Sequence, residues 1–292
     1  MIGVARDTAV AAGSGETTAA DEALAGAAVA ALRDELEAYP KPGLVSPVDS
    51  GAHRDMDFAL MCRSAEALRQ PFAHLAAAGR LGHGFATALA PLGRDAERAM
   101  LQATGGVNTH RGAIFSMGLI VAAIAHAHAT EAQPTPAAIQ STLRRDWGEA
   151  LEAHAAAGVQ ASSHGGLVRQ ATGAAGARGE AARGFPAVFQ VGLPAYRAAL
   201  ARGLEAEAAR IHTLFTVMEA VDDTTVLYRG GADGSLFVRR AAGEFLAAGG
   251  CLAEGWFERA EGLHRSFVAR NLSPGGCADL LAATLLVAGC SA

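Results

Sequence analysis

The sequence predicts an all-α protein: a single-domain helical bundle with a buried central helix and glycine-rich active-site loops. Three observations lead to this prediction. Hydrophobic residues make up 51% of the 292 residues and charged residues only 18%, so the chain can bury a large core. Aromatic residues make up only 5%, while alanine and leucine dominate, which favours helices over sheets. Apolar residues also recur at helical spacing almost from end to end.

The first half of the chain alternates helical patterns with short breaks. A capping box at Thr18 and Asp21 begins the first helix, and Pro40 ends it. Segment 112–130 is apolar nearly all round, which predicts a central buried helix. We expect helices over about 19–39, 55–69, 71–79, 93–104, 112–130 and 136–157.

In the second half, a glycine-rich region over 158–192 is interpreted as a functional loop, because a linker would be more polar. Residues 222–234 are predicted to be a polar connection, with TVLYRGG and SLFVRR as the candidates for a short hairpin. Further helices are expected over about 194–202, 205–221, 235–248, 253–269 and 276–289. We interpret residues 1–18 as a disordered extension and 19–292 as one all-α catalytic domain.

Several classes of protein are disfavoured. The net charge is −5 and no basic stripe is present, so we expect no nucleic-acid partner. The most apolar stretch, Gly112 to Ala125, is about 14 residues and short of a membrane span, and the N-terminus lacks the apolar core of a signal peptide. The cysteines are widely spaced, which predicts reduced thiols and a cytoplasmic location.

Rare residue types mark three loops. Lys41 is the only lysine among 24 basic residues, and Asn108 and Asn271 are the two asparagines. Where composition disfavours a residue type, each residue that remains is more often one that cannot be replaced. Two prolines surround Lys41, which makes it a poised cation, although a solvated lysine in a helix-stop turn is the alternative.

Histidine and carboxylate residues follow in the His53-Arg54-Asp55-Met56-Asp57 run. His53, Asp55 and Asp57 could surround a hard cation or the substrate. The alternative is that a carboxylate caps the next helix.

Two glycine-rich loops precede apolar helices. Gly105 to Gly112 leads into the most apolar helix, where free N–H groups bind anions and Arg111 offers a fork for phosphate. An N-cap made by Asn or Thr is the alternative. Asn271 to Gly276 repeats this arrangement before the last helix.

Adjacent carboxylates occur at Asp222 and Asp223. If they end a helix they oppose its dipole, and a cation would relieve that repulsion. The Gly173–Phe185 segment carries Arg178 among glycines, and a flexible turn is the favoured interpretation.

Six motifs occur in one order over about residues 35–288: KPGLV, SGAHRDMDF, GGVNTHRGAIFSMG, GARGEAARGFP, DDTTVLYRGG and NLSPGGCADLLAAT. Together they resemble the triphosphoribosyl-dephospho-coenzyme A synthase family. The resemblance implies an all-α enzyme that transfers the 5-triphosphoribosyl group of ATP to the 2′-hydroxyl of 3′-dephospho-CoA and releases adenine. Arg111 stands where the family often has lysine, and SSHGG at 162–166 diverges from the family.

This chemistry suggests roles for the loop residues. Proton transfer and ribose orientation are expected from His53, Asp55, Asp57, Asn108 and His110. The ATP phosphates are expected to contact Lys41, Gly106, Thr109, Arg111, Arg178, Arg229, Ser273, Gly275 and Gly276. Carboxylates suit Mg²⁺ on the phosphates, and the candidates are Asp55, Asp57, Asp222 and Asp223.

The implied partners are ATP, 3′-dephospho-CoA and a phosphoribosyl-dephospho-CoA transferase that receives the product for the acyl-carrier subunit of malonate decarboxylase or citrate lyase. A homodimer is one option for the assembly. Two alternatives to the transferase stay open. One is a helical Mg²⁺-dependent hydrolase of an ADP-ribose-like N-glycosidic bond, and the other is a non-catalytic nucleotide-binding helical module.

Overall fold

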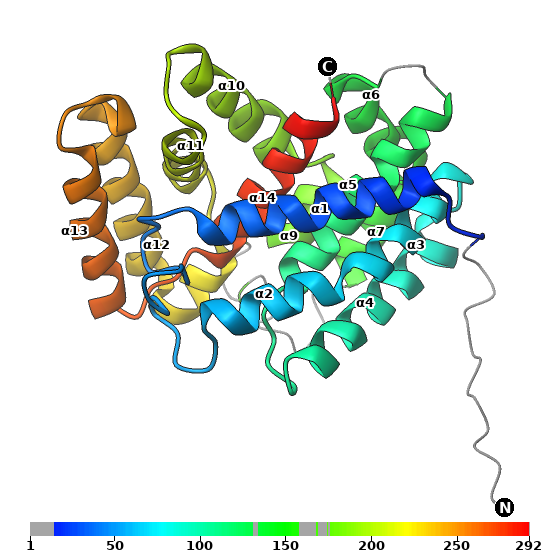
Figure 1. The fold of residues 1–292 in the computed structure, drawn as a ribbon, viewed down its shortest axis with the longest axis horizontal. Coiled ribbons are helices and arrows are strands. Elements are labelled where there is room, and N and C mark those ends of the chain that lie inside the picture. Colours follow the sequence, from blue (N-terminus) through cyan, green and yellow to red (C-terminus); the bar gives the residue numbers. More distant parts are fainter. Residues whose placement is uncertain (1–14, 131–133, 158–167, 169–173, 175, 292) are drawn as a thin grey trace, which may run out of the picture.

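The computed structural model describes residues 15–130, 134–157, 168, 174 and 176–291, and these contain helices and no strand (Figure 1). The all-α prediction is confirmed. The α-helices are α1 (Ala19–Glu37), α2 (Phe58–Ala67), α3 (Arg69–Arg80), α4 (Ala90–Ala103), α5 (Arg111–Thr130), α6 (Pro136–Ser141), α7 (Gly148–Ala157), α9 (Gly176–Ala182), α10 (Leu193–Ala201), α11 (Ala206–Ala220), α12 (Thr224–Ala247), α13 (Trp256–Ala269) and α14 (Gly275–Cys290). Short π-helical turns cover Phe85–Leu89, Thr142–Asp146 and Ala187–Gly192, and a 3₁₀ turn covers Gly250–Leu252. Residues 1–14 of the predicted extension and most of 158–172 lie outside the described residues.

Helices α5 and α14 form the centre of the fold. Both are apolar on nearly every side, and they pack against each other while α1 and α3 cover them. Figure 1 shows α1 lying across this pair. The backbones approach closely, because a Cβ atom at Gly79 of α3 would lie 2.1 Å from the carbonyl oxygen of Ala122 in α5. The predicted central helix is therefore confirmed, and glycine is what lets its neighbour pack so closely.

Helix α5 is longer than the apolar stretch suggested. It has 20 residues and is apolar enough to cross a membrane by length and composition, but 72% of its most apolar window is buried inside the fold. The helix predicted over 112–130 is confirmed, and His126, which follows the apolar stretch, continues the helix while its Nδ1 pairs with the Gly79 carbonyl oxygen at 3.1 Å. Packing within the fold thus accounts for the apolar character of α5.

The predicted capping box at the start of α1 is confirmed. The Thr18 hydroxyl accepts a hydrogen bond from the Asp21 N–H at 3.3 Å, and the Asp21 carboxylate accepts the Thr18 N–H at 2.9 Å. The same carboxylate pairs with Arg80 at 2.9 Å. The start of α1 is therefore tied to the end of α3.

The expected polar connection over 222–234 is wrong, and both candidate hairpin segments are helical. Helix α12 begins at Thr224 and continues to Ala247, with one non-helical residue, Gly231, at φ 62°. Gly230 lies against another segment, since a Cβ there would come within 2.6 Å of the Leu272 side chain. The glycines that suggested a turn instead permit a kink and a close contact.

Candidate active site

One large cavity, of about 1500 Å³, brings together most of the predicted loops. Its walls come from α1, α4, α5, α9, α12, α14 and the loops before them. The predicted residues that line it are His53, Asp55, Asn108, Thr109, His110, Arg111, Arg178, Asp222, Asp223, Arg229, Ser273, Gly275 and Gly276. Three predicted residues do not line it, namely Lys41, Asp57 and Gly106. We call this space the central cavity.

Lys41 is not a poised cation. Its side chain is fully buried, and its Nζ donates to the Glu35 backbone oxygen at 2.6 Å and to the Glu35 carboxylate at 2.5 Å. Burial lowers the pKa of Lys41, and the Glu35 carboxylate opposes that shift. The position of Lys41 therefore does not support the predicted phosphate contact, because its ammonium group forms a buried ion pair with Glu35.

Asp57 and Gly106 have local structural roles. Asp57 is the N-cap of α2, and its carboxylate accepts the Leu60 N–H at 2.7 Å. Gly106 adopts φ 93° in the turn after α4, and its N–H bonds the Leu101 carbonyl at 2.8 Å. For Asp57 the capping alternative fits the structure, although Asp57 and not Asp55 is the cap. For Gly106 the left-handed backbone requires glycine.

His53 belongs to a hydrogen-bonded group with Arg229 and Ser273. Arg229 Nη2 lies 3.2 Å from His53 Nδ1, and His53 Nε2 lies 2.8 Å from the Ser273 hydroxyl. A guanidinium only donates, so Nδ1 accepts and the neutral ring carries its proton on Nε2, which donates to Ser273. Burial and the Arg229 charge lower the pKa of His53 to about 4. Both ring nitrogens are thus occupied, which suits positioning better than proton transfer.

Arg229 also joins two loops around this group. Its Nη1 donates to the Ala52 carbonyl at 2.8 Å and reaches the Asn271 side-chain oxygen at 3.5 Å. Asn271 itself has φ 55°. Asparagine tolerates this left-handed conformation better than most residues do. The rare asparagine is therefore explained by its backbone and by its contact with Arg229.

His110 has a different environment. It is 3% exposed, its Nδ1 lies 2.7 Å from the Ser64 hydroxyl, and Ser64 lies 2.6 Å from the Thr109 hydroxyl. Its Nε2 is buried and has no hydrogen-bond partner among the described residues. Burial and the Lys41 charge lower the pKa of His110 to about 4. A neutral imidazole thus lines the cavity, with Nδ1 hydrogen-bonded to Ser64 and Nε2 unpaired among the described residues.

The loop before α5 combines a cap with a cationic side chain. The Asn108 side-chain oxygen accepts the Arg111 N–H at 3.3 Å, which is the capping geometry. The Arg111 guanidinium lies at the cavity wall, 3.2 Å from the Glu97 carboxylate, and is 45% exposed. Arg178 reaches the same cavity from α9. These arginines and the start of α5 can bind an anion together.

Asp223 caps a helix instead of opposing one. It precedes α12, and its Oδ1 accepts the N–H groups of Thr225 at 2.7 Å and Val226 at 3.2 Å. Its Oδ2 accepts the Cys277 N–H of α14 at 2.8 Å. The predicted repulsion between Asp223 and a helix dipole was wrong. Helix α11 ends at Ala220, and Asp223 stands at the N-terminus of α12, where a carboxylate is favourable. Asp222 is exposed and accepts the Ser235 hydroxyl at 2.9 Å.

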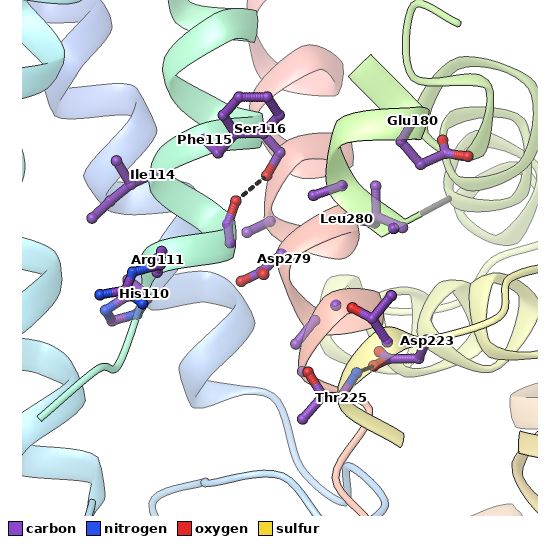
Figure 2. A pocket seen from close by; sticks show the side chains of 18 of the residues that line it. His110, Arg111, Ile114, Phe115, Ser116, Glu180, Asp223, Thr225, Asp279 and Leu280 are labelled. Atoms are coloured by element: carbon purple, nitrogen blue, oxygen red, sulfur yellow. Dashed lines mark hydrogen bonds between the residues drawn. The ribbon is translucent and has the colours of Figure 1, made fainter. Parts of the chain in front are cut away.

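Asp279 is a cavity carboxylate that the sequence did not single out. It projects from the first turns of α14 toward the beginning of α5, near His110 and Arg111 (Figure 2). Burial, helped by the Asp223 and Glu35 charges, raises the pKa of Asp279 well above its usual value. Its place in the NLSPGGCADLLAAT motif was the available signal, but helix-start carboxylates are common.

The four predicted metal ligands do not form a cluster. Within the part of the chain that the structure describes, no group of three or more His, Cys, Asp or Glu side chains could hold a metal ion. Asp57 is a cap outside the cavity, and both oxygens of Asp223 accept amides. Asp55 and Asp222 remain at the cavity wall. One or two carboxylates fit Mg²⁺ that is bound mainly by substrate phosphates and water.

Known proteins resemble this chain over most of its length. The profile of the CitG family, ATP:dephospho-CoA triphosphoribosyl transferase, matches residues 21–292. A relative from Stutzerimonas stutzeri is 40% identical over 276 residues, 93% of each chain, and is named probable 2-(5″-triphosphoribosyl)-3′-dephosphocoenzyme-A synthase. A relative with that name from Pseudomonas fluorescens is 43% identical, and the match covers 91% of this chain and 90% of the relative. Another from Vibrio cholerae is 38% identical, and the match covers 88% of this chain and 84% of the relative. No solved structure matches the chain.

Proposed function

The chain belongs to the CitG family of ATP:dephospho-CoA triphosphoribosyl transferases, and from this membership we propose its reaction in detail. The enzyme transfers the 5-triphosphoribosyl group of ATP to the 2′-hydroxyl of 3′-dephospho-CoA and releases adenine. The observation that carries the proposal is the central cavity, where two helix N-termini meet arginine side chains and a buried imidazole whose Nε2 has no partner among the described residues. Its volume of about 1500 Å³ exceeds the ~300–1,000 Å³ typical of a site for one small ligand.

The triphosphate supplies the binding energy that positions the ribose. Helices α5 and α14 both begin at the cavity, so their first amides and dipoles favour anionic groups there. Arg111 and Arg178 also line the cavity and add guanidinium forks. Because the triphosphate is retained in the product, these contacts can hold the sugar while its glycosidic bond breaks.

His110 is the best placed proton acceptor. In the orientation in which its Nδ1–H donates to Ser64, and Ser64 donates to Thr109, the Nε2 atom carries the free lone pair of a ring that lines the cavity. The depressed pKa keeps the ring neutral at pH 7. His110 can then accept the proton of the 2′-hydroxyl as that oxygen attacks C1′ of the ribose. His53 instead holds Ser273 and Arg229 in place.

We include Mg²⁺ in the proposal as a companion of ATP. Asp55 and Asp222 would hold it at the cavity wall. When bound, the ion neutralises charge on the triphosphate. We further propose that the enzyme acts in the cytoplasm and passes its product to a phosphoribosyl-dephospho-CoA transferase. The acceptor would be the acyl-carrier subunit of malonate decarboxylase or of citrate lyase.

The reaction is tested by incubating the protein with ATP, 3′-dephospho-CoA and Mg²⁺ and identifying the products by mass spectrometry. We expect free adenine and a triphosphoribosyl adduct of dephospho-CoA in equal amounts. Free triphosphoribose without the adduct would instead establish a hydrolase. ATP that remains unchanged after long incubation would indicate a nucleotide-binding module. A parallel sample with excess EDTA tests the Mg²⁺ requirement, and full turnover there would remove the ion from the proposal.

A further inference from the structure

Among the residues that the structure describes, Asp279 at the wall of the central cavity has no cationic partner. It comes from α14, and the groups that act on it are the Ala113 backbone N–H, which bonds it, and the carboxylates of Asp223 and Glu35. No basic side chain appears among these groups. A structural carboxylate normally finds an arginine, a lysine or several amides. Asp279 therefore has hydrogen-bonding capacity left for a ligand.

The start of α5 is shaped around this carboxylate. A Cβ atom at Gly112 would lie 2.0 Å from Asp279 Oδ2, so any side chain at position 112 would displace the carboxyl group. Gly112 is helical and does not have a positive φ, so its backbone conformation does not require glycine. The close approach of Asp279 is what excludes a side chain here.

His110 lies two residues before Gly112, and both His110 and Asp279 line the central cavity, although the unpartnered Nε2 of His110 is itself buried. Figure 2 shows Asp279 directed from α14 toward the first turn of α5, with His110 on the far side of that turn. Asp279 comes from α14, and His110 immediately precedes α5. The first turn of α5 therefore lies between the two groups.

We propose that Asp279 is a catalytic residue, the general acid that protonates adenine as it leaves the ribose. The inference rests on the proposed glycosyl transfer and adds a residue to it. Asp279 gives its proton to a ring nitrogen of adenine, and the electron pair of the C1′–N9 bond goes to N9. The 2′-oxygen of dephospho-CoA forms the new bond to C1′, and its proton goes to His110 Nε2. His110 then loses a proton to water and Asp279 regains one from water, which restores both groups.

The electrostatic surroundings keep Asp279 protonated before the reaction. Burial and the nearby carboxylates of Asp223 and Glu35 raise its pKa. Glu35 is itself paired with Lys41, and the Cys277 thiol on the same helix has a raised pKa and stays neutral. Arg111 of α5 and His110, which precedes that helix, also line the cavity. Because a leaving purine anion needs a proton, an acid in this state lowers the barrier to departure.

The test compares ATP with an analogue whose leaving group needs no proton, 4-nitrophenyl β-ribofuranoside 5′-triphosphate. We expect Asp279→Asn to slow adenine release from ATP by about 10²–10⁴-fold while release of 4-nitrophenolate stays near the wild-type rate. The alkaline limb of the wild-type pH profile, where the acid loses its proton, should be absent from the variant. Asp233→Asn, which changes an exposed carboxyl outside the cavity lining, serves as the control and should match wild type with both substrates.

The outcomes separate this inference from the proposed function. An Asp279→Asn protein that is slowed equally with both substrates, while melting at the wild-type temperature, would show a base or a binding group and overturn the acid role. A protein that melts early and loses both reactions would show a purely structural carboxyl and overturn it too. Adenine release is measured whatever the acceptor, so a wild-type protein that makes free triphosphoribose would refute the transferase and leave the acid role standing. If wild type releases no adenine, both proposals fail.

Discussion

The carboxylate of Asp223 and the backbone N–H of Cys277 are joined by a 2.8 Å hydrogen bond that connects the beginnings of two helices. The other carboxylate oxygen accepts the first amides of α12, beginning with Thr225 at 2.7 Å. One buried side chain therefore caps α12 and fixes the first turn of α14 beside it. Since both helix starts line the central cavity, this bond sets the distance between two of its walls.

We predict that Asp223→Ala mainly destabilises the fold. It removes a helix N-cap, which is worth about 1–2 kcal/mol, and leaves the buried Cys277 N–H without an acceptor, which costs about 1–3 kcal/mol. The free energy of unfolding in urea should fall by about 2–5 kcal/mol in total. Asp222→Ala, at the exposed neighbour, is the control and should change it by less than about 0.5 kcal/mol. Equal stability of the two variants would contradict the capping role.

The buried ion pair between Lys41 and Glu35 gives a second prediction. Lys41→Met leaves the Glu35 carboxylate buried without its cation, and breaking a buried pair in this way costs about 3–5 kcal/mol. The double variant Lys41→Met/Glu35→Leu should regain most of that loss, because neither charge then remains. Lys41→Arg should not substitute, since a planar guanidinium is too large for a fully enclosed ammonium site. Urea unfolding curves measure all three variants.

The exposed pair Arg33–Glu66 offers a matched control on the same helix. Its atoms are 3.3 Å apart and both side chains are nearly half exposed. Solvent screens such pairs, so Arg33→Met should cost no more than about 1 kcal/mol. If Lys41→Met cost as little, the ion pair would be no more important than one on the surface.

The helices were predictable because their apolar spacing is strong, and α1 and α5 follow it closely. The first part of α12, residues 224–234, was not predictable as helix. Glycines usually break helices, but here Gly230 makes room for the Leu272 side chain and Gly231 permits a kink. Only tertiary contacts decide between these meanings.

For the site, rarity correctly marked Lys41, Asn108 and Asn271 as constrained, but the constraints are a buried ion pair, a helix cap and a left-handed backbone. The motifs, taken together, correctly identified most of the loops that line the cavity. Asp279 was missed because a carboxylate in a first helical turn has a common local explanation. Its lack of a cation is visible only in three dimensions.

Acid sensitivity follows from the two buried imidazoles. The pKa of both His53 and His110 is about 4 in the folded protein, against about 6.5 when unfolded. The folded pKa is depressed, so their contribution is fully present above pH 6.5 and is lost as pH falls from about 6.5 to 4. Protonation of each imidazole should lower the free energy of unfolding by about 3 kcal/mol over that window.

The measurement is the free energy of unfolding between pH 7 and 4.5 for wild type and His110→Gln. We expect the variant to lose less stability across the window, since it has one fewer group that must stay neutral. His128→Gln is the control, because His128 is exposed and should not alter the slope. Parallel curves for wild type and His110→Gln would show that His110 titrates normally in the folded state.

The last prediction concerns Arg111 and Asn108, which are joined by the bond from the Arg111 N–H to the Asn108 side chain at 3.3 Å. Removing the Arg111 guanidinium takes one charged hydrogen-bonding group from the proposed triphosphate site, worth about 1.5–3 kcal/mol. The dissociation constant of ATP should rise about 10- to 100-fold in Arg111→Ala, measured by calorimetry. The affinity for dephospho-CoA without ATP should barely change. Arg98→Ala, an exposed arginine of α4 outside the cavity lining, is the control.

Asn108→Ala separates a cap from a substrate contact at the same helix start. As a cap, Asn108 stabilises the fold by about 1 kcal/mol, so the melting temperature should fall while turnover per folded molecule persists. As a contact that orients the ribose, it would affect turnover more than stability. The observed bond to the Arg111 N–H favours the first result, and the two readouts together decide. An Arg111→Ala protein that binds ATP normally but has lost dephospho-CoA would mean that the α5 start holds the other substrate, and the triphosphate would then belong at α14.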